Sequence, residues 1–117
     1  MEQSGFDLGL RVLLREVGVE IDREAVSPGG RTVWFEYKGS IQGVRPGLLR
    51  TDTLKKAIAN GALLRGLAEH PPYVVLTSHL PTTGVGLAML SAAQTLEYLQ
   101  DVICIYDPTQ TARLRQL

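Results

Sequence analysis

Residues 34–41 read Trp34-Phe35-Glu36-Tyr37-Lys38-Gly39-Ser40-Ile41. This aromatic, β-prone run predicts a strand that breaks at glycine. In an extended strand, residues two apart point to the same face. Glu36 and Lys38 are therefore expected side by side together with Trp34, while Phe35 and Tyr37 point the other way. A carboxylate and an ammonium group near a strand end can hold a divalent metal ion and steady a nearby anion, as metal-assisted hydrolysis of a phosphodiester requires.

The size and composition of the chain predict one globular domain over residues 1–117. Of the 117 residues, 44% are hydrophobic and 21% are charged, and the 12 basic residues balance the 12 acidic ones. Zero net charge argues against a histone-like electrostatic binder but leaves room for local patches. Cys104 is the single cysteine, so a disulfide or zinc cluster within the chain is excluded and a buried thiol is expected. Without a signal peptide or an apolar run of about 20 residues, we expect a soluble, cytoplasmic protein that does not enter membranes.

Hydrophobic spacing and turn residues predict an alternation of helices and strands. The expected elements are a helix over 6–17, strands over 19–26 and 31–38, a helix over 51–69, a strand over 73–77, a helix over 85–100, a strand over 101–106, and a short helix in the tail, 107–117. The first two strands should form an antiparallel hairpin, and the later strands should join by right-handed parallel crossovers. Strand 73–77 lacks alternation, which indicates burial on both faces. The order predicts an α/β fold with a mixed sheet flanked by helices.

A metal site needs a second acid beside Glu36, and the register of the hairpin decides which one is available. Three acids lie on the preceding strand: Glu20, Asp22 and Glu24. With a two-residue turn at 28–29, position 22 opposes position 35, and Asp22 and Glu36 lie on opposite faces. With a three-residue loop at 28–30, or with a bulge, position 22 opposes position 36 and the carboxylates converge. The sequence leaves both registers open; Asp22 is the best candidate ligand, and the backbone carbonyl of Tyr37 is a third contributor.

Basic residues follow the acidic site closely. Between residues 38 and 56 there is one acid, Asp52, and there are five basic residues: Lys38, Arg45, Arg50, Lys55 and Lys56. Arg45 and Arg50 are suited to bidentate contacts with phosphate, and the helix that begins near Thr51 adds a favourable dipole. A polyanion that passes the metal would meet this segment. Lys38 would contact its phosphate or orient the attacking water.

Asp22 on one strand, then Glu36-Tyr37-Lys38, a loop and a long helix resemble the PD-(D/E)xK nuclease superfamily over roughly residues 5–80. The resemblance implies a restriction endonuclease-like fold, here in the order α-β-β-α-β-α-β. It also implies that Asp22, Glu36 and Lys38 are catalytic, with magnesium (or manganese) as cofactor, DNA as substrate and a homodimer as the working unit. The chain departs from the family pattern in two ways: no proline precedes Asp22, and one strand fewer precedes the helix. The second departure hints at a fragment of a longer protein.

Other interpretations of the same residues stay open. A module that keeps the nuclease fold could bind DNA without cleaving it, with Glu36 and Lys38 as an ordinary solvated strand face. A third possibility is an enzyme that acts on a small phosphate compound through the loop at 78–86, where His79 and Gly84 would matter. That loop lacks the lysine and the spacing of a P-loop, and a lone histidine beside a turn is usually structural.

Overall fold

The computed structural model describes residues 7–38, 48 and 51–117 of the chain. Its main sheet has five strands in the order β1-β4-β5-β6-β7. These strands are β1 (Asp7–Leu8), β4 (Arg23–Val26), β5 (Thr32–Lys38), β6 (Tyr73–Thr77) and β7 (Asp101–Cys104). A small second sheet pairs β2 (Val12–Leu14) with β3 (Val19–Ile21). The helices are α1 (Thr51–Leu64), α2 (Gly84–Thr95), α3 (Pro108–Thr111) and the 3-10 helix η3 (Ala112–Gln116).

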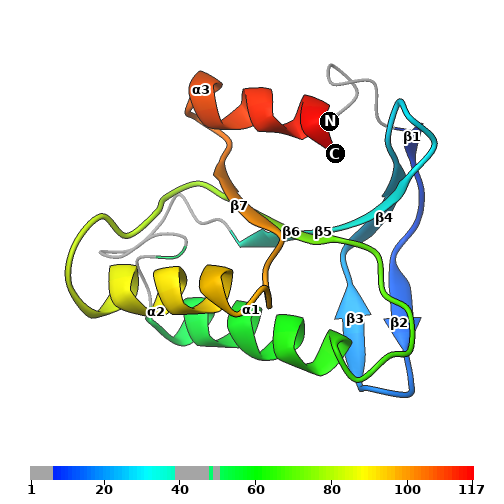
Figure 1. Cartoon of the computed structure of the whole chain (residues 1–117), viewed down its shortest axis with the longest axis horizontal. Helices are drawn as coiled ribbons and strands as arrows, with labels where there is room; N and C mark the ends of the chain where they lie inside the picture. Colours follow the sequence, from blue (N-terminus) through cyan, green and yellow to red (C-terminus); the bar gives the residue numbers. More distant parts are fainter. Residues whose placement is uncertain (1–6, 39–47, 49–50) are drawn as a thin grey trace.

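The main sheet is covered on both faces, so the fold has three layers. Figure 1 shows α1 and α2 side by side on one face and α3 with η3 on the other. Trp34, Leu54 and Leu90 belong to one apolar cluster between the sheet and α1 and α2. Phe35 and Leu114 belong to a second cluster on the opposite face. The general α/β class with a mixed sheet is therefore confirmed, and Trp34 and Phe35 point to opposite faces as predicted.

The antiparallel hairpin of β4 and β5 has the register that brings position 22 opposite position 36. Val26 pairs with Thr32 and Arg23 pairs with Phe35. The loop contains residues 28–30, because the Ser27 amide donates to the carbonyl of Arg31 at 2.7 Å. Gly30 has a φ of 83°, a left-handed conformation that glycine adopts without steric cost. Of the two open registers, the three-residue loop is the one that forms.

The central part of the sheet is parallel, as expected. Lys38 of β5 is the partner of Thr77 in β6, and Thr77 is the partner of Cys104 in β7. All five residues of β6 are buried, which agrees with a strand covered on both faces. The carboxyl ends of β5, β6 and β7 therefore lie along one edge of the sheet.

The predicted helix over 6–17 is wrong, because the described part of that segment, residues 7–17, forms β1, β2 and a turn instead. Its apolar residues have helical spacing, yet the Gly9 amide donates to the carbonyl of Glu24 at 2.7 Å and Val12 pairs with Ile21. Pairing with strands far along the chain outweighs local periodicity here, as is common for strands. Leu10 consequently lies 80% exposed. Gly18, expected to end a helix, adopts a φ of 69° in the turn between β2 and β3.

Several boundaries also differ from the prediction. The strand expected over 19–26 is divided at Asp22, with β3 in the small sheet and β4 in the main sheet. The helices α1 and α2 and the strand β7 end earlier than predicted, at Leu64, Thr95 and Cys104. Within the described ranges, no helix has the length and apolarity to cross a lipid bilayer.

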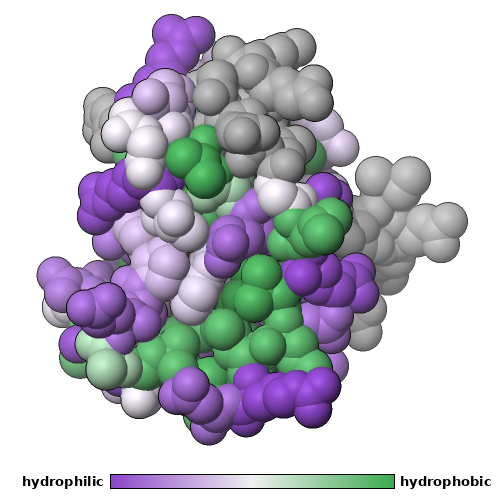
Figure 2. Space-filling model, turned by 90° about the vertical axis from the view of Figure 1, so that its right-hand side faces the viewer, coloured by the Kyte–Doolittle hydropathy of each residue, from purple (hydrophilic) through white to green (hydrophobic). Residues whose placement is uncertain are grey.

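One face of the molecule carries a group of exposed apolar side chains. Figure 2 shows them at the level of the β2–β3 hairpin, in the lower part of the view. Leu13 of β2 is 56% exposed, and a hollow beside it is also lined by Leu14 and Leu67. We call this group the hairpin patch.

Gly61 of α1 was expected to permit a close approach, and the structure shows its partner. A Cβ atom at this position would lie 2.2 Å from the carbonyl oxygen of Tyr98 and 3.1 Å from Cδ2 of Leu99. We predict that Gly61→Ala lowers the free energy of unfolding by about 1–3 kcal/mol, although alanine is the better helix former. Urea denaturation measures this, with Gly29→Ala as the control, because its nearest atom is 3.8 Å away. Equal stability of the two variants would contradict the close contact.

Candidate functional site

Asp22 lies at the bend where the chain leaves the small sheet and enters the main one. The Tyr37 amide donates to Oδ2 of Asp22 at 3.0 Å, and the Asp22 amide donates to Oε2 of Glu36 at 3.3 Å. These two contacts continue the β4–β5 pairing by one position. In each of them a side-chain carboxylate accepts the hydrogen bond that a backbone carbonyl would accept within the sheet. The bend thus places Asp22 beside β5, near enough for its negative charge to act on the carboxylate of Glu36.

Glu36 and Lys38 occupy the same face of β5, as the sequence predicted. Glu36 is 4% exposed, and its Oε1 lies 3.2 Å from Nζ of Lys38. The Lys38 side chain is 22% exposed, so it lies between the buried carboxylate of Glu36 and solvent. Asp22, Glu36 and Lys38 are therefore one cluster in the structure.

The other two acids of the preceding segment have different partners. The Trp34 indole donates from Nε1 to Oε2 of Glu24 at 2.9 Å, so Glu24 supports a tryptophan that is buried in the core. Glu20 forms an exposed ion pair with Arg11 at 3.2 Å. Of the three acids considered from the sequence, Asp22 is the one that contacts Glu36.

The electrostatics of the cluster are those of a buried acid, Glu36, that lies near a second acid, Asp22. Burial raises the pKa of Glu36, the negative charge of Asp22 raises it further, and Lys38 opposes both effects. Because the pKa of Glu36 in the folded state is raised, the folded protein retains a proton that the unfolded chain has lost. The contribution of Glu36 to stability is therefore full at acidic pH below its ordinary pKa, and it is lost as the pH rises through the raised value.

Strand alternation assigns the carbonyl of Tyr37 to one side of β5. Alternate residues of a strand present their backbone groups to opposite neighbours. The Trp34 amide bonds the carbonyl of Pro72 on the β6 side, whereas the Tyr37 amide bonds Asp22 on the opposite side. The Tyr37 carbonyl thus shares the Asp22 side of β5.

Two carboxylates and one carbonyl form an all-oxygen donor set. Such a set fits Mg²⁺ or Mn²⁺ with water molecules as the remaining ligands. Among the described residues there is no group of three His, Cys, Asp or Glu side chains that could hold a metal ion by itself. The backbone carbonyl and water would have to complete the coordination.

The predicted DNA-binding residues divide into two pairs. Lys55 and Lys56 lie exposed in the first half of α1, where a polyanion could reach them. Arg45 and Arg50 lie outside the described residues. The exposure of Lys55 and Lys56 is thus compatible with contacts to phosphate groups.

Tyr73, the first residue of β6, is a neighbour of the cluster that the sequence reasoning missed. Burial raises the pKa of its phenol, and the negative charges of Glu36 and Asp22 raise it further, so both carboxylates lie near enough to act on it. Its hydroxyl is buried and has no hydrogen bond of ordinary geometry within the described part of the chain, but the Asn60 side chain lies near enough to act as a poorly aligned partner that lowers the pKa. Tyr73 pairs with Trp34 in register, so strand pairing was the signal that could have placed it on the Glu36 face.

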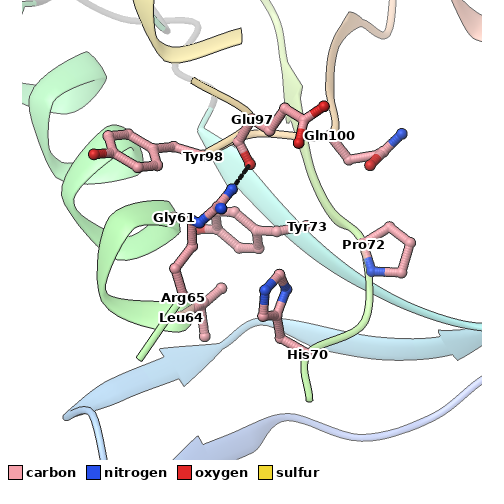
Figure 3. A pocket seen from close by; sticks show the side chains of 9 residues that line it. All are labelled: Gly61, Leu64, Arg65, His70, Pro72, Tyr73, Glu97, Tyr98 and Gln100. Carbon is pink, nitrogen blue, oxygen red and sulfur yellow. Dashed lines mark hydrogen bonds between the residues drawn. The ribbon is translucent and has the colours of Figure 1, made fainter. Parts of the chain in front are cut away.

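Tyr73 also lines a small pocket at the amino end of β6, beside Gly61, Arg65 and His70. Figure 3 shows the side chain of Arg65, the first residue after α1, directed to the carbonyl of Glu97, to which it donates at 3.4 Å. Arg65 also donates to the carbonyl of Leu96 at 3.3 Å and lies over the Tyr98 ring. These contacts fasten α1 to the segment that follows α2, which is a structural role.

His79 is held by local contacts at the carboxyl end of β6. Its Nδ1 lies 2.9 Å from Oγ of Ser78, whose side chain is buried. The Thr77 hydroxyl donates to the carbonyl of Lys38 at 2.6 Å and accepts from the His79 amide. These bonds support the structural interpretation of His79 and tie the ends of β5 and β6 together.

The proximity of Asp22 and Glu36 has a direct test. We predict that Asp22→Asn lowers the pKa of Glu36, because a like charge that disfavours its ionised form is removed. Carboxyl-detected NMR titration of Glu36 measures the change. The matched control is Glu20→Gln, which removes an exposed acid and should leave the titration of Glu36 unchanged. An unchanged pKa in Asp22→Asn would show that the two carboxylates do not interact.

The buried hydroxyl of Tyr73 gives a second prediction. Because the contact of this buried hydroxyl with Asn60 is poorly aligned, Tyr73→Phe should keep the free energy of unfolding or raise it by about 1 kcal/mol. Urea denaturation checks this, with Tyr106→Phe as the control, since Tyr106 is 64% exposed. A clear loss of stability in Tyr73→Phe alone would show that the hydroxyl has a stabilising partner.

No protein-family model, curated protein or solved structure matches this chain. The arrangement of Asp22, Glu36 and Lys38 is the feature of the molecule that indicates a function.

Proposed function

We propose that the protein is a magnesium-dependent deoxyribonuclease that hydrolyses phosphodiester bonds on a restriction endonuclease-like α/β core. The observation that carries this proposal is the convergence of Asp22 and Glu36, with Lys38 3.2 Å from Glu36. A Glu-x-Lys pair in a strand is common by chance. A second carboxylate brought to it by a bend between two sheets is a more specific arrangement.

The proposed roles follow from the donor atoms. Asp22, Glu36 and the Tyr37 carbonyl would hold the metal ion, which supplies an activated water and charge neutralisation when bound. Lys38 would turn from Glu36 to a phosphate oxygen and stabilise the charge that develops there. By analogy with the family, the product carries a 5′-phosphate. Lys55 and Lys56, together with Arg45 and Arg50, would contact the DNA backbone.

The state of Glu36 supports a cation in this place. Its carboxyl group is buried next to another acid, and both conditions raise its pKa. A divalent cation would remove the cost of ionising Glu36 because it offsets two negative charges at once. The unfavourable electrostatics of the cluster are those expected of a site that is completed by a metal ion.

The chain topology supports the general α/β class with a mixed sheet, and the restriction endonuclease-like core goes beyond what this topology supports. The resemblance calls for one more strand upstream than the sequence reveals, and β1 adds a strand beside β4 in the main sheet. The crossover from β5 through α1 to β6 is parallel, as the resemblance requires. The helix expected at the amino-terminal side is replaced by strands among the described residues.

A DNA-binding module without catalysis is the second candidate. The observation that favours it is the ion pair of Lys38 with Glu36, since a lysine that neutralises the acid reduces the need for a metal. Both candidates bind DNA through the same basic residues. Metal binding separates them.

The first experiment measures cleavage of supercoiled and linear DNA with Mg²⁺ or Mn²⁺. We predict that Glu36→Gln, Asp22→Asn and Lys38→Met each reduce cleavage by about 100-fold or more while DNA binding in a gel-shift assay persists. Glu20→Gln is the matched control and should cleave like the wild type. Cleavage that survives Glu36→Gln, or is absent from the wild type with either metal, would contradict the proposal.

The second experiment titrates Mn²⁺ into the protein by calorimetry at several pH values. Metal ligands must be deprotonated, so we predict that the affinity for Mn²⁺ falls as the pH is lowered through the raised pKa of Glu36. Glu36→Gln should abolish the binding. DNA binding without any uptake of Mn²⁺ would favour the non-catalytic module.

A further inference from the structure

Helix α2 lies on the outside of the fold but carries no charge. Figure 1 shows it at one side of the sheet with α1 as its neighbouring helix. Between residues 80 and 96 the chain has no Asp, Glu, Lys, Arg or His, although 21% of all residues are charged. Leu90 and Ala93 are the buried residues of α2. A surface helix normally exposes charged and polar residues, so this composition indicates a face that is covered in the working protein.

Four exposed apolar residues form one row along α2, while Leu87, which is 38% exposed, lies on another side of the helix. Val85 is 69% exposed and Leu96, directly after the helix, is 55% exposed, while Ala88 and Ala92 between them are also exposed. The steps of three, four and four residues place them along one side of the helix. We call this row the α2 stripe. It is large at both ends and small in the middle.

We propose that the α2 stripe is the interface between two copies of this chain, with the two α2 helices packed antiparallel across a two-fold axis. In that arrangement Val85 of each copy lies against Leu96 of the other, and Ala88 lies against Ala92. A two-fold interface requires one surface to complement itself. The order large, small, small, large meets this condition, and the two alanines allow the helix backbones to approach closely.

The charge pattern favours a second copy over other occupants. A nucleic acid or an anionic membrane surface would require Lys or Arg along the stripe, and the 80–96 segment has none. An uncharged face meets its own copy without like-charge repulsion. The hairpin patch differs in this respect, because Arg15 and Glu16 line its hollow.

The length of α2 limits the strength of the contact. Its 12 residues extend about 18 Å, which gives an interface at the small end of the range for specific complexes. We therefore expect a reversible dimer with a dissociation constant on the order of micromolar. This inference does not depend on the proposed nuclease activity, because neither Asp22, Glu36 nor Lys38 takes part in the stripe.

Sedimentation velocity over a range of protein concentrations tests the proposal. The wild type should shift from monomer to dimer as the concentration rises. Ala88→Glu should weaken the dimer by at least about 100-fold, because two carboxylates would be buried near the axis. Gln94→Glu adds the same charge to another exposed side of α2 and should leave the dimer intact, as should Leu13→Glu in the hairpin patch.

A cross-linking experiment covers the case in which Ala88→Glu fails to fold. Separate Ala88→Cys and Ala92→Cys proteins, both with Cys104→Ser, are mixed and oxidised. The mixture should form disulfide-linked dimers faster than either protein alone, since the proposed packing pairs 88 with 92. A wild type that stays monomeric, a dimer that Leu13→Glu disrupts instead, or equal rates of cross-linking in all three samples would overturn the proposal.

Discussion

The pairing of β4 with β5 through a three-residue loop is the constraint on which the candidate site depends. Residues 28–30 form the loop, and Gly30 supplies its left-handed conformation. Because side chains alternate along a strand, one residue fewer in the loop would move Asp22 to the face opposite Glu36. The site is therefore built by backbone geometry far from its own side chains. The loop that Gly30 permits thus decides whether Asp22 and Glu36 lie on the same face of the sheet.

The bend at Asp22 adds a second element to this construction. In a continuous strand from Val19 to Val26, residue 22 would belong to the sheet, and its backbone amide and carbonyl would be hydrogen-bonded to neighbouring strands. Instead the chain changes sheets, and the Asp22 amide and carboxylate contact β5 directly. Glu36 is buried and lies near the negative charge of Asp22, and both conditions raise its pKa. The break that assembles the cluster supplies the second of these two causes.

The parts of the fold that were predictable are those in which local pattern and tertiary context agree. Strand 73–77 is apolar on both faces and is buried on both faces, and the alternation of Trp34 and Phe35 matches the two core clusters. The segment 6–17 was not predictable in this way, because its helical spacing competes with pairing to Glu24 and Ile21, which are distant in sequence. Within the site, Glu36 and Lys38 follow from strand alternation alone. Asp22 required the loop length, and Tyr73 required the parallel register with β5, neither of which the sequence reveals.

The two helices on one face of the sheet expose different kinds of surface, and this difference connects the proposed nuclease with the proposed dimer. Helix α1 exposes Lys55 and Lys56, whereas α2 exposes the uncharged stripe. A polyanion is attracted to the first surface and finds no counter-charge on the second, so a second copy on α2 leaves the basic side of α1 free. Glu36 lies on β5, which adjoins β4 and β6 in the sheet. The α2 stripe contains no residue of these strands and no residue of the candidate site. Two copies joined through α2 would thus each retain a complete site, and a two-fold axis would relate the two sites as it relates the strands of a duplex.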